Sequence, residues 1–189
     1  MVKSFILASC SPQRKNLLEQ INMVPEKIDP ANIDETPLKG EKATAYVKRI
    51  AIEKAKNVAL KNPNKVILAC DTIVLADAKI IQKAHNDDEQ IKIMKILSGK
   101  SHKVLSAVCV IDKNGKQRVR VSTTRILMKR LSDAEIKNYV ATGEWKGCAG
   151  YKIEGCLAGF VRKIIGSYSG VVGLPLFETR NLLIGAGIK

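Results

Sequence analysis

The chain has 189 residues, of which 46% are hydrophobic, 26% are charged and 4% are aromatic, and its formal net charge is +14. These values predict a soluble globular protein with one domain over residues 1–189, and they argue against stacking of single-stranded nucleic acid on aromatic side chains. The positive charge would attract DNA, RNA, an anionic membrane or an anionic small substrate, but the lysines and arginines form no basic tail or stripe.

The first half of the chain alternates strands and helices. In chain order we expect a buried strand over 4–8, a helix over 13–21, a loop over 25–37, a long helix over 41–60, a strand over 65–75 and its hairpin partner over 78–83.

The second half continues this alternation. We expect a helix over 87–97, strands over 102–112, 117–129 and 158–165, a capped helix from Ser132 to Gly143, and a last helix that opens near Pro175. An Asn-Gly hairpin signal joins the first two of these strands. Strands mixed with helices, with at least one hairpin, predict an α/β fold with a mixed twisted sheet flanked by helices.

The five cysteines have no CxxC spacing, so they predict neither a zinc site nor a disulfide framework. The apolar stretch at the N-terminus is too short for a signal peptide, and no stretch reaches the roughly 18 apolar residues of a membrane span. We therefore expect a cytoplasmic protein without a membrane partner.

Arg14 lies on the apolar side of the first predicted helix, because it precedes Leu17 and Leu18 by three and four residues. It also falls in the first turn, where the helix dipole disfavours a cation. A bound anion would reverse this effect, and the hydroxyls of Ser9 and Ser11 with free backbone N–H groups would complete a phosphate site. An arginine that extends from the apolar stripe into solvent explains the position equally well.

Two further charged residues occupy apolar positions. Lys54 falls on the inward stripe of the long helix, seven residues after Val47 and four after Ile50, so it needs a partner or a bound anion unless its ammonium reaches solvent. Asp71 interrupts an apolar strand, where an unpaired carboxylate is strongly destabilising. A metal ligand or general base is the preferred hypothesis for Asp71, and the capping of a neighbouring loop is the alternative.

Other candidates carry less information. Glu35 lies in a loop and Lys83 ends a short strand, so a solvated charge explains each one alone. The glycine-rich segment 166–175 could cradle phosphate, but it lacks the spacing and the lysine of a Walker loop, and a tight strand-to-helix turn explains it equally well.

The two histidines, His85 and His102, are too few to build a histidine zinc cluster. A Ser–His–Asp triad made of Ser11, His102 and Asp71 has no support from a G-x-S-x-G elbow.

Several motifs follow one another along nearly the whole chain. They are LASCSPQRKNLL, IDET, IAIEKA, ACDTIV, QK, LSGKSHKV, GEWKGCAGYKIEG and GSYSGVVGLPL. With these motifs the sequence resembles the Maf family of nucleoside triphosphate pyrophosphatases. The resemblance implies two lobes around a deep cleft, similar to the inosine triphosphate pyrophosphatases. It also implies hydrolysis of a nucleoside triphosphate at the α-phosphorus to monophosphate and pyrophosphate, with a divalent cation (Mg²⁺, Mn²⁺ or Co²⁺).

The resemblance assigns roles to the matching positions of this chain. Asp71 matches the catalytic acid–base residue and, together with Glu35, the ligands of a metal or water. The positions that match phosphate contacts are Ser9, Arg14, Lys54 and Lys83. For Arg14, Lys54 and Asp71 the implied roles agree with the apolar faces on which the sequence alone places these charges.

Gln13, Thr72 and Glu154 match the positions that separate the family's branches by base. The branch that prefers dTTP and UTP has Arg, Thr and Gln there, whereas the branch that prefers 7-methyl-GTP has a glutamate at the last position and Trp and Gln at the other two. The set is therefore mixed, although the segment FVRKIIGSYSGVVGLPLFET is similar to the dTTP/UTP branch. In addition, Ala84 follows Lys83 where the family has proline.

The favoured function is thus house-cleaning hydrolysis of non-standard or excess nucleotides, leaning towards dTTP and UTP, with a 7-methyl-GTP pyrophosphatase as the alternative. A nucleic-acid-binding protein is a second hypothesis, which the scattered basic residues do not support. A nucleotide-binding regulator of cell division is a third, and the intact Asp71, Lys54 and Lys83 argue against loss of turnover. The expected partner is a nucleoside triphosphate, not a specific nucleic acid, and a homodimer is left open.

Overall fold

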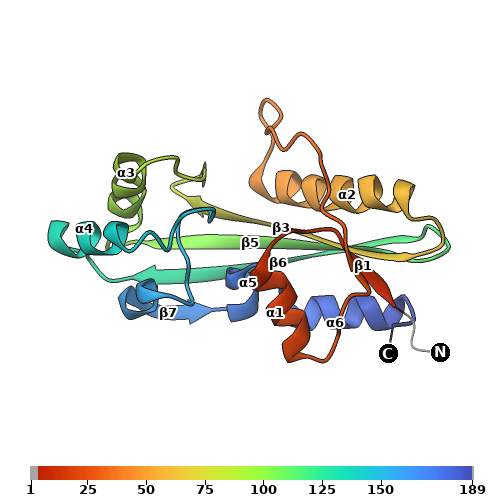
Figure 1. Ribbon diagram of the computed structural model, residues 1–189. Helices are drawn as coiled ribbons and strands as arrows, with labels where there is room; N and C mark the ends of the chain where they lie inside the picture. Colours follow the sequence, from red (N-terminus) through yellow and green to blue (C-terminus); the bar gives the residue numbers. More distant parts are fainter. Residues whose placement is uncertain (1–3, 189) are drawn as a thin grey trace.

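The computed structural model describes residues 4–188 and contains a seven-stranded sheet (Figure 1). The strands are β1 (Phe5–Leu7), β2 (Lys27–Ile28), β3 (Val66–Ala76), β4 (Lys79–Ile81), β5 (Ser101–Ile111), β6 (Gln117–Met128) and β7 (Val161–Ile165). Their order is β2-β1-β3-β5-β6-β7, and β4 also pairs with β3. β1 runs parallel to β2 and β3 while the other pairs are antiparallel, so the predicted mixed sheet is confirmed.

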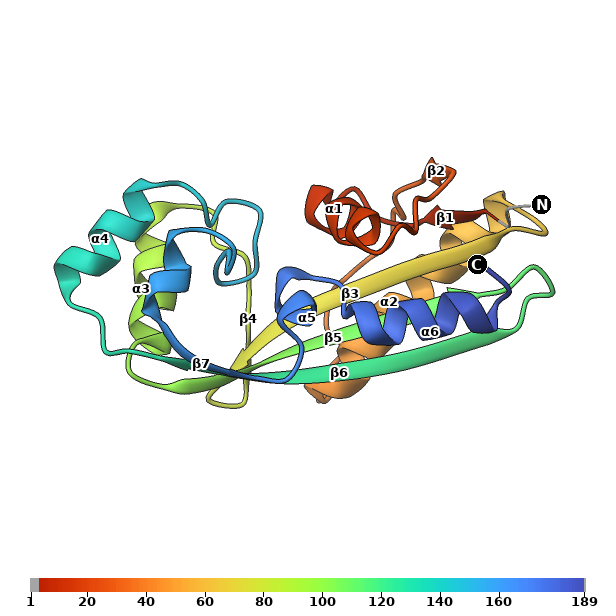
Figure 2. The same cartoon turned by 90° about the horizontal axis from the view of Figure 1, so that it is seen from below.

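Helices flank the sheet, as predicted, and they lie on both of its faces. They are α1 (Pro12–Gln20), α2 (Ala43–Lys61), α3 (Asp87–Leu97), α4 (Asp133–Ala141), α5 (Tyr168–Val172) and α6 (Leu176–Gly185). Neighbouring side chains of β3 alternate between the two faces, so Ile67 packs under α2 whereas Leu68 packs against α1 and α6. A third core surrounds α3 and α4 at the other end of β3, β5 and β6, which run the length of the molecule (Figure 2).

Local sequence signals fix the helix ends. Ser132 Oγ accepts a hydrogen bond from Glu135 N, and the Glu135 side chain accepts one from Ser132 N, so the predicted capping box is confirmed. Ser11 caps α1 by accepting from Arg14 N. None of the helices between residues 4 and 188 has the length and apolarity of a membrane span.

The structure corrects several predicted elements. The strand expected over 158–165 begins only at Val161, because Cys156–Phe160 forms a 3₁₀ helix that places Leu157 and Phe160 on the same core. The expected loop 25–37 contributes the short strand β2, and the glycine-rich segment contains the short helix α5. The ends of the predicted domain, residues 1–3 and 189, lie outside the described residues.

Candidate functional site

A cleft of about 780 Å³ opens between the two ends of the molecule. The β1–α1 turn, the segment before α2 and α2 itself line one side, and the residues after β4 with the loop before the 3₁₀ helix line the other. All the residues predicted for the site line this cleft: Ser9, Gln13, Arg14, Glu35, Lys54, Asp71, Thr72, Lys83 and Glu154. The sheet positions the site, because β3 carries Asp71 and Thr72 to the cleft floor.

Asp71, Lys54 and Glu35 form one ionic cluster. Lys54 Nζ lies 2.9 Å from Asp71 Oδ1 and 2.9 Å from Glu35 Oε1. The side chains of Lys54 and Asp71 are only 11% and 8% exposed, whereas that of Glu35 is 49% exposed. The buried lysine therefore has a carboxylate partner, which answers the question its inward position raised.

The packing of α2 and β3 explains why these charges meet. Tyr46, Val47, Ile50, Ala51, Ala55 and Val58 bury one face of α2 against the sheet. Lys54 lies on that face, one turn after Ile50, as predicted. Asp71 pairs with Ala107 in β5, the small residue opposite it in the middle of the sheet.

Arg14 is fixed at the β1–α1 turn. Its Nη1 donates to Ser9 Oγ at 2.9 Å, and its Nε donates to the Gly173 carbonyl at 2.9 Å. Ser9 Oγ also accepts from Ser11 N at 3.2 Å. The arginine is half-buried and hydrogen-bonded rather than extended into solvent, and its contact with phosphate stays a prediction.

Gly173 joins the glycine-rich segment to this turn. Its φ of 136° is a backbone conformation that residues other than glycine rarely adopt. Its carbonyl accepts from Arg14, from Cys70 Sγ at 3.1 Å and from Thr72 Oγ1 at 3.3 Å. The glycine-rich segment therefore supports the site by accepting hydrogen bonds through a carbonyl. This favours a tight strand-to-helix turn over a loop that binds phosphate through its N–H groups.

The remaining predicted residues surround the open part of the cleft. Thr72 Oγ1 lies 2.9 Å from Ser106 Oγ, and Gln13 Oε1 accepts from Ser11 Oγ at 3.0 Å. The Lys83 backbone pairs with Ala149, which brings the segment after β4 beside the loop that carries Glu154.

The Ser–His–Asp alternative is not borne out. His102 Nε2 lies 2.6 Å from Tyr151 Oη, and burial lowers the pKa of His102 to about 4. Ser11 Oγ donates to Gln13 and Asp71 binds Lys54, so each member of the proposed triad has a different partner.

The model of the Maf-like protein family matches residues 4–186. The chain belongs to the Maf-like protein family. It is 45% identical over 187 residues to the dTTP/UTP pyrophosphatase of Caulobacter vibrioides, covering 98% of this chain and 97% of that protein. It is 48% identical over 186 residues to the dTTP/UTP pyrophosphatase of Sphingopyxis alaskensis, again covering 98% and 97%.

Among solved structures, this Maf-like chain is similar to a nucleoside-triphosphatase / dITP/XTP pyrophosphatase from Mycobacterium abscessus. The two share 15% identity and a TM-score of 0.44, over 68% of this chain and 75% of that chain. The fold class itself rests on the sheet topology described above.

The donor set of this Maf-like chain suits a metal held jointly with substrate. No group of three or more His, Cys, Asp or Glu side chains within residues 4–188 could hold a metal ion by itself. The carboxylates of Asp71 and Glu35 nevertheless converge on one point, now taken by Lys54 Nζ. Mg²⁺ is commonly bound by one or two carboxylates together with substrate phosphates and water, so the residues present fit such a cation.

Three residues that line the cleft of this Maf-like chain escaped the sequence analysis, and so did Arg49, which does not line it. Lys146 and Lys152 line the cleft, but a lysine in a loop is typical of a solvated surface. Tyr46 donates its hydroxyl to the Glu35 carbonyl at 2.8 Å, and Arg49 donates to the Thr36 carbonyl at 3.1 Å. Contacts to backbone carbonyls of a distant loop leave no pattern in the sequence.

Proposed function

We propose that this Maf-like protein hydrolyses nucleoside triphosphates to the monophosphate and pyrophosphate, with dTTP and UTP as preferred substrates, and so removes excess or non-standard nucleotides. The observation that carries the proposal is the Asp71–Lys54–Glu35 cluster in a cleft that Arg14 and Lys83 also line. The two relatives named dTTP/UTP pyrophosphatase, at 45% and 48% identity over nearly the full length, support the substrate preference.

The proposed reaction is the attack of water on the α-phosphorus. Asp71 takes a proton from the water while the water oxygen bonds to the α-phosphorus. The bond between the α-phosphorus and the oxygen that bridges to the β-phosphorus breaks, and pyrophosphate leaves. Ser9, Arg14, Lys54 and Lys83 bind the phosphate oxygens and stabilise their charge. Lys54 has a second role, because its contact with Asp71 orients that carboxylate.

Asp71 and Glu35 would hold a divalent cation (Mg²⁺, Mn²⁺ or Co²⁺) together with phosphate oxygens. The cation would supply charge neutralisation and orientation of the triphosphate. The half-exposed Glu35 carboxylate can turn towards a cation while Asp71 stays buried beside Lys54.

The test is a panel of nucleoside triphosphates assayed for pyrophosphate release, with dTTP, UTP, CTP, dGTP and 7-methyl-GTP. We expect the highest kcat/KM for dTTP and UTP. Release of orthophosphate would contradict the bond assignment, and a preference for 7-methyl-GTP would contradict the substrate class. Tight nucleotide binding without turnover would instead favour the regulatory hypothesis.

Glu154→Gln is expected to shift kcat/KM towards dTTP and UTP by a factor of about ten, which corresponds to one hydrogen bond to a charged group. Glu154 lines the cleft together with Gln13 and Thr72. An ionised glutamate only accepts, so it can bind N3–H of uracil or thymine but repels the flanking carbonyls, whereas an amide also donates. A carboxylate suits the N1–H and N2–H₂ edge of guanine, so we expect measurable turnover of guanine nucleotides by the unmodified protein.

The measurement for Glu154→Gln is the ratio of UTP to GTP turnover before and after the change. Glu144→Gln is the control for a general effect on the loop, because Glu144 accepts a hydrogen bond from Cys156 N but does not line the cleft. An unchanged ratio in Glu154→Gln would show that this residue does not contact the base.

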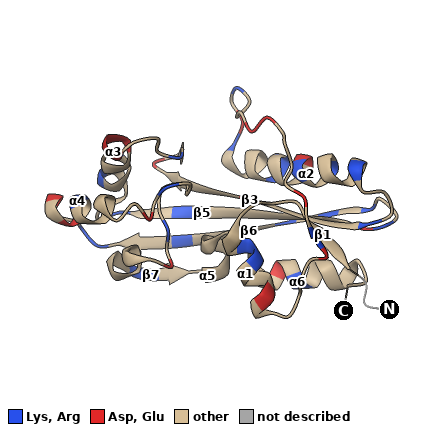
Figure 3. Cartoon of the chain, in the orientation of Figure 1, with Lys and Arg blue, Asp and Glu red and all other residues tan. Residues whose placement is uncertain are grey.

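The basic surface is expected to give only weak, sequence-independent DNA binding, with a Kd on the order of micromolar or higher at physiological salt. Lysine and arginine are spread over strands and helices at both ends of the molecule (Figure 3). Fluorescence anisotropy with random and mixed-sequence duplexes measures this affinity. A sequence-specific nanomolar complex at that salt would overturn the proposed function in favour of nucleic-acid binding.

The proposal treats the chain as one domain, because β3, β5 and β6 continue through both sides of the cleft. All five cysteines are free, and we propose the reducing cytoplasm as the compartment. The homodimer hypothesis is tested by light scattering of the purified protein.

A further inference from the structure

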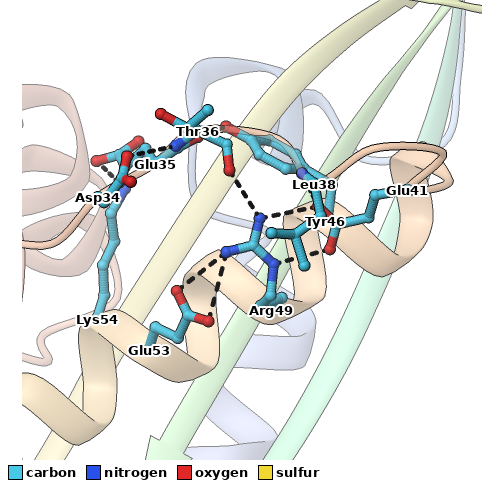
Figure 4. A network of polar contacts seen from close by, with 9 residues as sticks. All are labelled: Asp34, Glu35, Thr36, Leu38, Glu41, Tyr46, Arg49, Glu53 and Lys54. Atoms are coloured by element: carbon cyan, nitrogen blue, oxygen red, sulfur yellow. Dashed lines mark hydrogen bonds and ion pairs between the residues drawn. The ribbon is translucent and has the colours of Figure 1, made fainter.

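The segment 29–42, which carries Glu35, contains no helix or strand. The Glu35 side chain is 49% exposed, yet its carboxylate lies 2.9 Å from Lys54 Nζ. Neither burial nor secondary structure holds it there. Side chains of α2 hold it there, and Figure 4 shows that their contacts converge on residues 34–38. We call these residues the Glu35 segment.

Arg49 of α2 binds three groups through its guanidinium. Its Nε and Nη2 each donate to one carboxylate oxygen of Glu41 at 2.8 Å, and Nη2 also donates to the Thr36 carbonyl at 3.1 Å. Its Nη1 donates to Glu53 at 3.1 Å. A planar guanidinium holds several acceptors in fixed directions, which the point charge of a lysine cannot do.

Two further hydrogen bonds hold the Glu35 segment, and one of them runs through a carboxylate that Arg49 binds. Leu38 N donates to Glu41 Oε2 at 3.1 Å, and Arg49 holds that Glu41 carboxylate in place. Tyr46 lies one turn before Arg49, with the arginine over its ring, and donates its hydroxyl to the Glu35 carbonyl. Arg49 therefore fixes the backbone after Glu35, and Tyr46 fixes Glu35 itself.

We propose that Arg49 is a positioning residue for Glu35, which it serves by fixing the Glu35 segment on α2 so that the Glu35 carboxylate faces Lys54 and Asp71. Arg49 does not line the cleft, so it acts through the segment and touches no reacting atom. The inference rests on the proposed function in one respect: Glu35 must contribute to turnover as a ligand of metal or water.

The kinetic test compares Arg49→Gln, Glu35→Gln and the double variant with the unmodified protein. We expect Arg49→Gln to lower kcat for dTTP by a factor of about ten to one hundred, and to raise the Mn²⁺ concentration for half-maximal activity. The double variant should be no slower than Glu35→Gln, because the two residues act through one carboxylate. Multiplicative losses in the double variant would overturn the proposal.

Arg118 provides a matched control. Its Nη1 donates to Asp112 at 3.1 Å, and Asp112 also accepts from Asn114 N and Lys116 N, so this arginine fixes a turn at the β5–β6 hairpin that does not line the cleft. Arg118→Gln should leave kcat and the Mn²⁺ dependence within about twofold of the unmodified protein. An equal loss in Arg118→Gln and Arg49→Gln would assign the effect to general stability and overturn the proposal.

Hydrogen exchange followed by mass spectrometry tests whether Arg49 holds the Glu35 segment, which we call the Arg49 clamp, without an assay of turnover. Arg49→Gln should accelerate exchange over residues 34–38 by a factor of about ten or more, while Arg118→Gln leaves it unchanged. Unchanged exchange in Arg49→Gln would overturn the clamp even if dTTP turnover falls. If no nucleotide is hydrolysed by the unmodified protein, the proposed function fails, and this readout still decides whether Arg49 holds the segment.

Glu41→Ala keeps the test decisive if Arg49→Gln does not fold, because it removes the carboxylate through which Arg49 holds Leu38 N. Faster exchange over residues 34–38 and lower kcat in that variant support the clamp. Exchange and kcat equal to those of the unmodified protein overturn it.

Discussion

Asp71→Asn is expected to abolish turnover of dTTP and UTP while the fold stays intact. Asp71 is 6% exposed in the middle of β3, and its carboxylate contacts Lys54 Nζ. An amide has nearly the same shape, but it cannot accept the proton of the attacking water and it binds a divalent cation poorly. Loss of such a base typically lowers kcat by a factor of about 100 or more. Pyrophosphate release measures the loss, and circular dichroism checks the fold.

Asp112→Asn is the control for removing a buried carboxylate. Asp112 is 9% exposed at the end of the β5–β6 hairpin, and it accepts from Asn114 N and Lys116 N without lining the cleft. We expect this variant to lose stability but to keep kcat within about twofold, because its interactions are local. Activity of Asp71→Asn within a few-fold of the unmodified protein would remove Asp71 from the mechanism.

Much of the site could be predicted because its charges lie where apolar residues belong. Lys54 and Asp71 are charged positions on buried faces of α2 and β3, and the structure pairs them. A charged residue at a position that the apolar pattern predicts to be buried can be recognised in the sequence, since an unpaired charge there would be strongly unfavourable. Glu35 gave no such signal because it lies on an exposed loop, and only the family resemblance singled it out.

The unpredicted parts depend on contacts between segments far apart in the sequence. Gly173 accepts hydrogen bonds from Arg14, Cys70 and Thr72 through its backbone carbonyl, and every residue has a carbonyl. The strand expected from residue 158 failed for a related reason. The 3₁₀ helix Cys156–Phe160 places Leu157 and Phe160 on the same core, whereas residues three apart in a strand point to opposite faces.

Lys54→Met is expected to lower kcat/KM for dTTP by a factor of about 100 or more and, in the same protein, to create a site for free Mn²⁺. The methionine keeps the apolar packing of α2 but removes the ammonium that lies 2.9 Å from both Asp71 and Glu35. Loss of one partner of a buried ion pair typically costs about 3–5 kcal/mol, because the other charge is left uncompensated. A divalent cation offsets that cost when it binds the two carboxylates, so its binding should stabilise the folded variant.

Thermal unfolding with and without Mn²⁺, in the absence of nucleotide, measures this effect. We expect Mn²⁺ to raise the Tm of Lys54→Met and to leave the Tm of the unmodified protein nearly unchanged, because Lys54 Nζ already lies between the carboxylates there. Lys56→Met is the matched control, since Lys56 is an exposed lysine on the same helix. If Mn²⁺ shifts the Tm of all three proteins equally, the cation binds elsewhere and the two carboxylates are not its ligands. If Lys54→Met instead unfolds at room temperature with or without Mn²⁺, the pair with Asp71 serves the fold, and Lys54 cannot be assigned to phosphate binding.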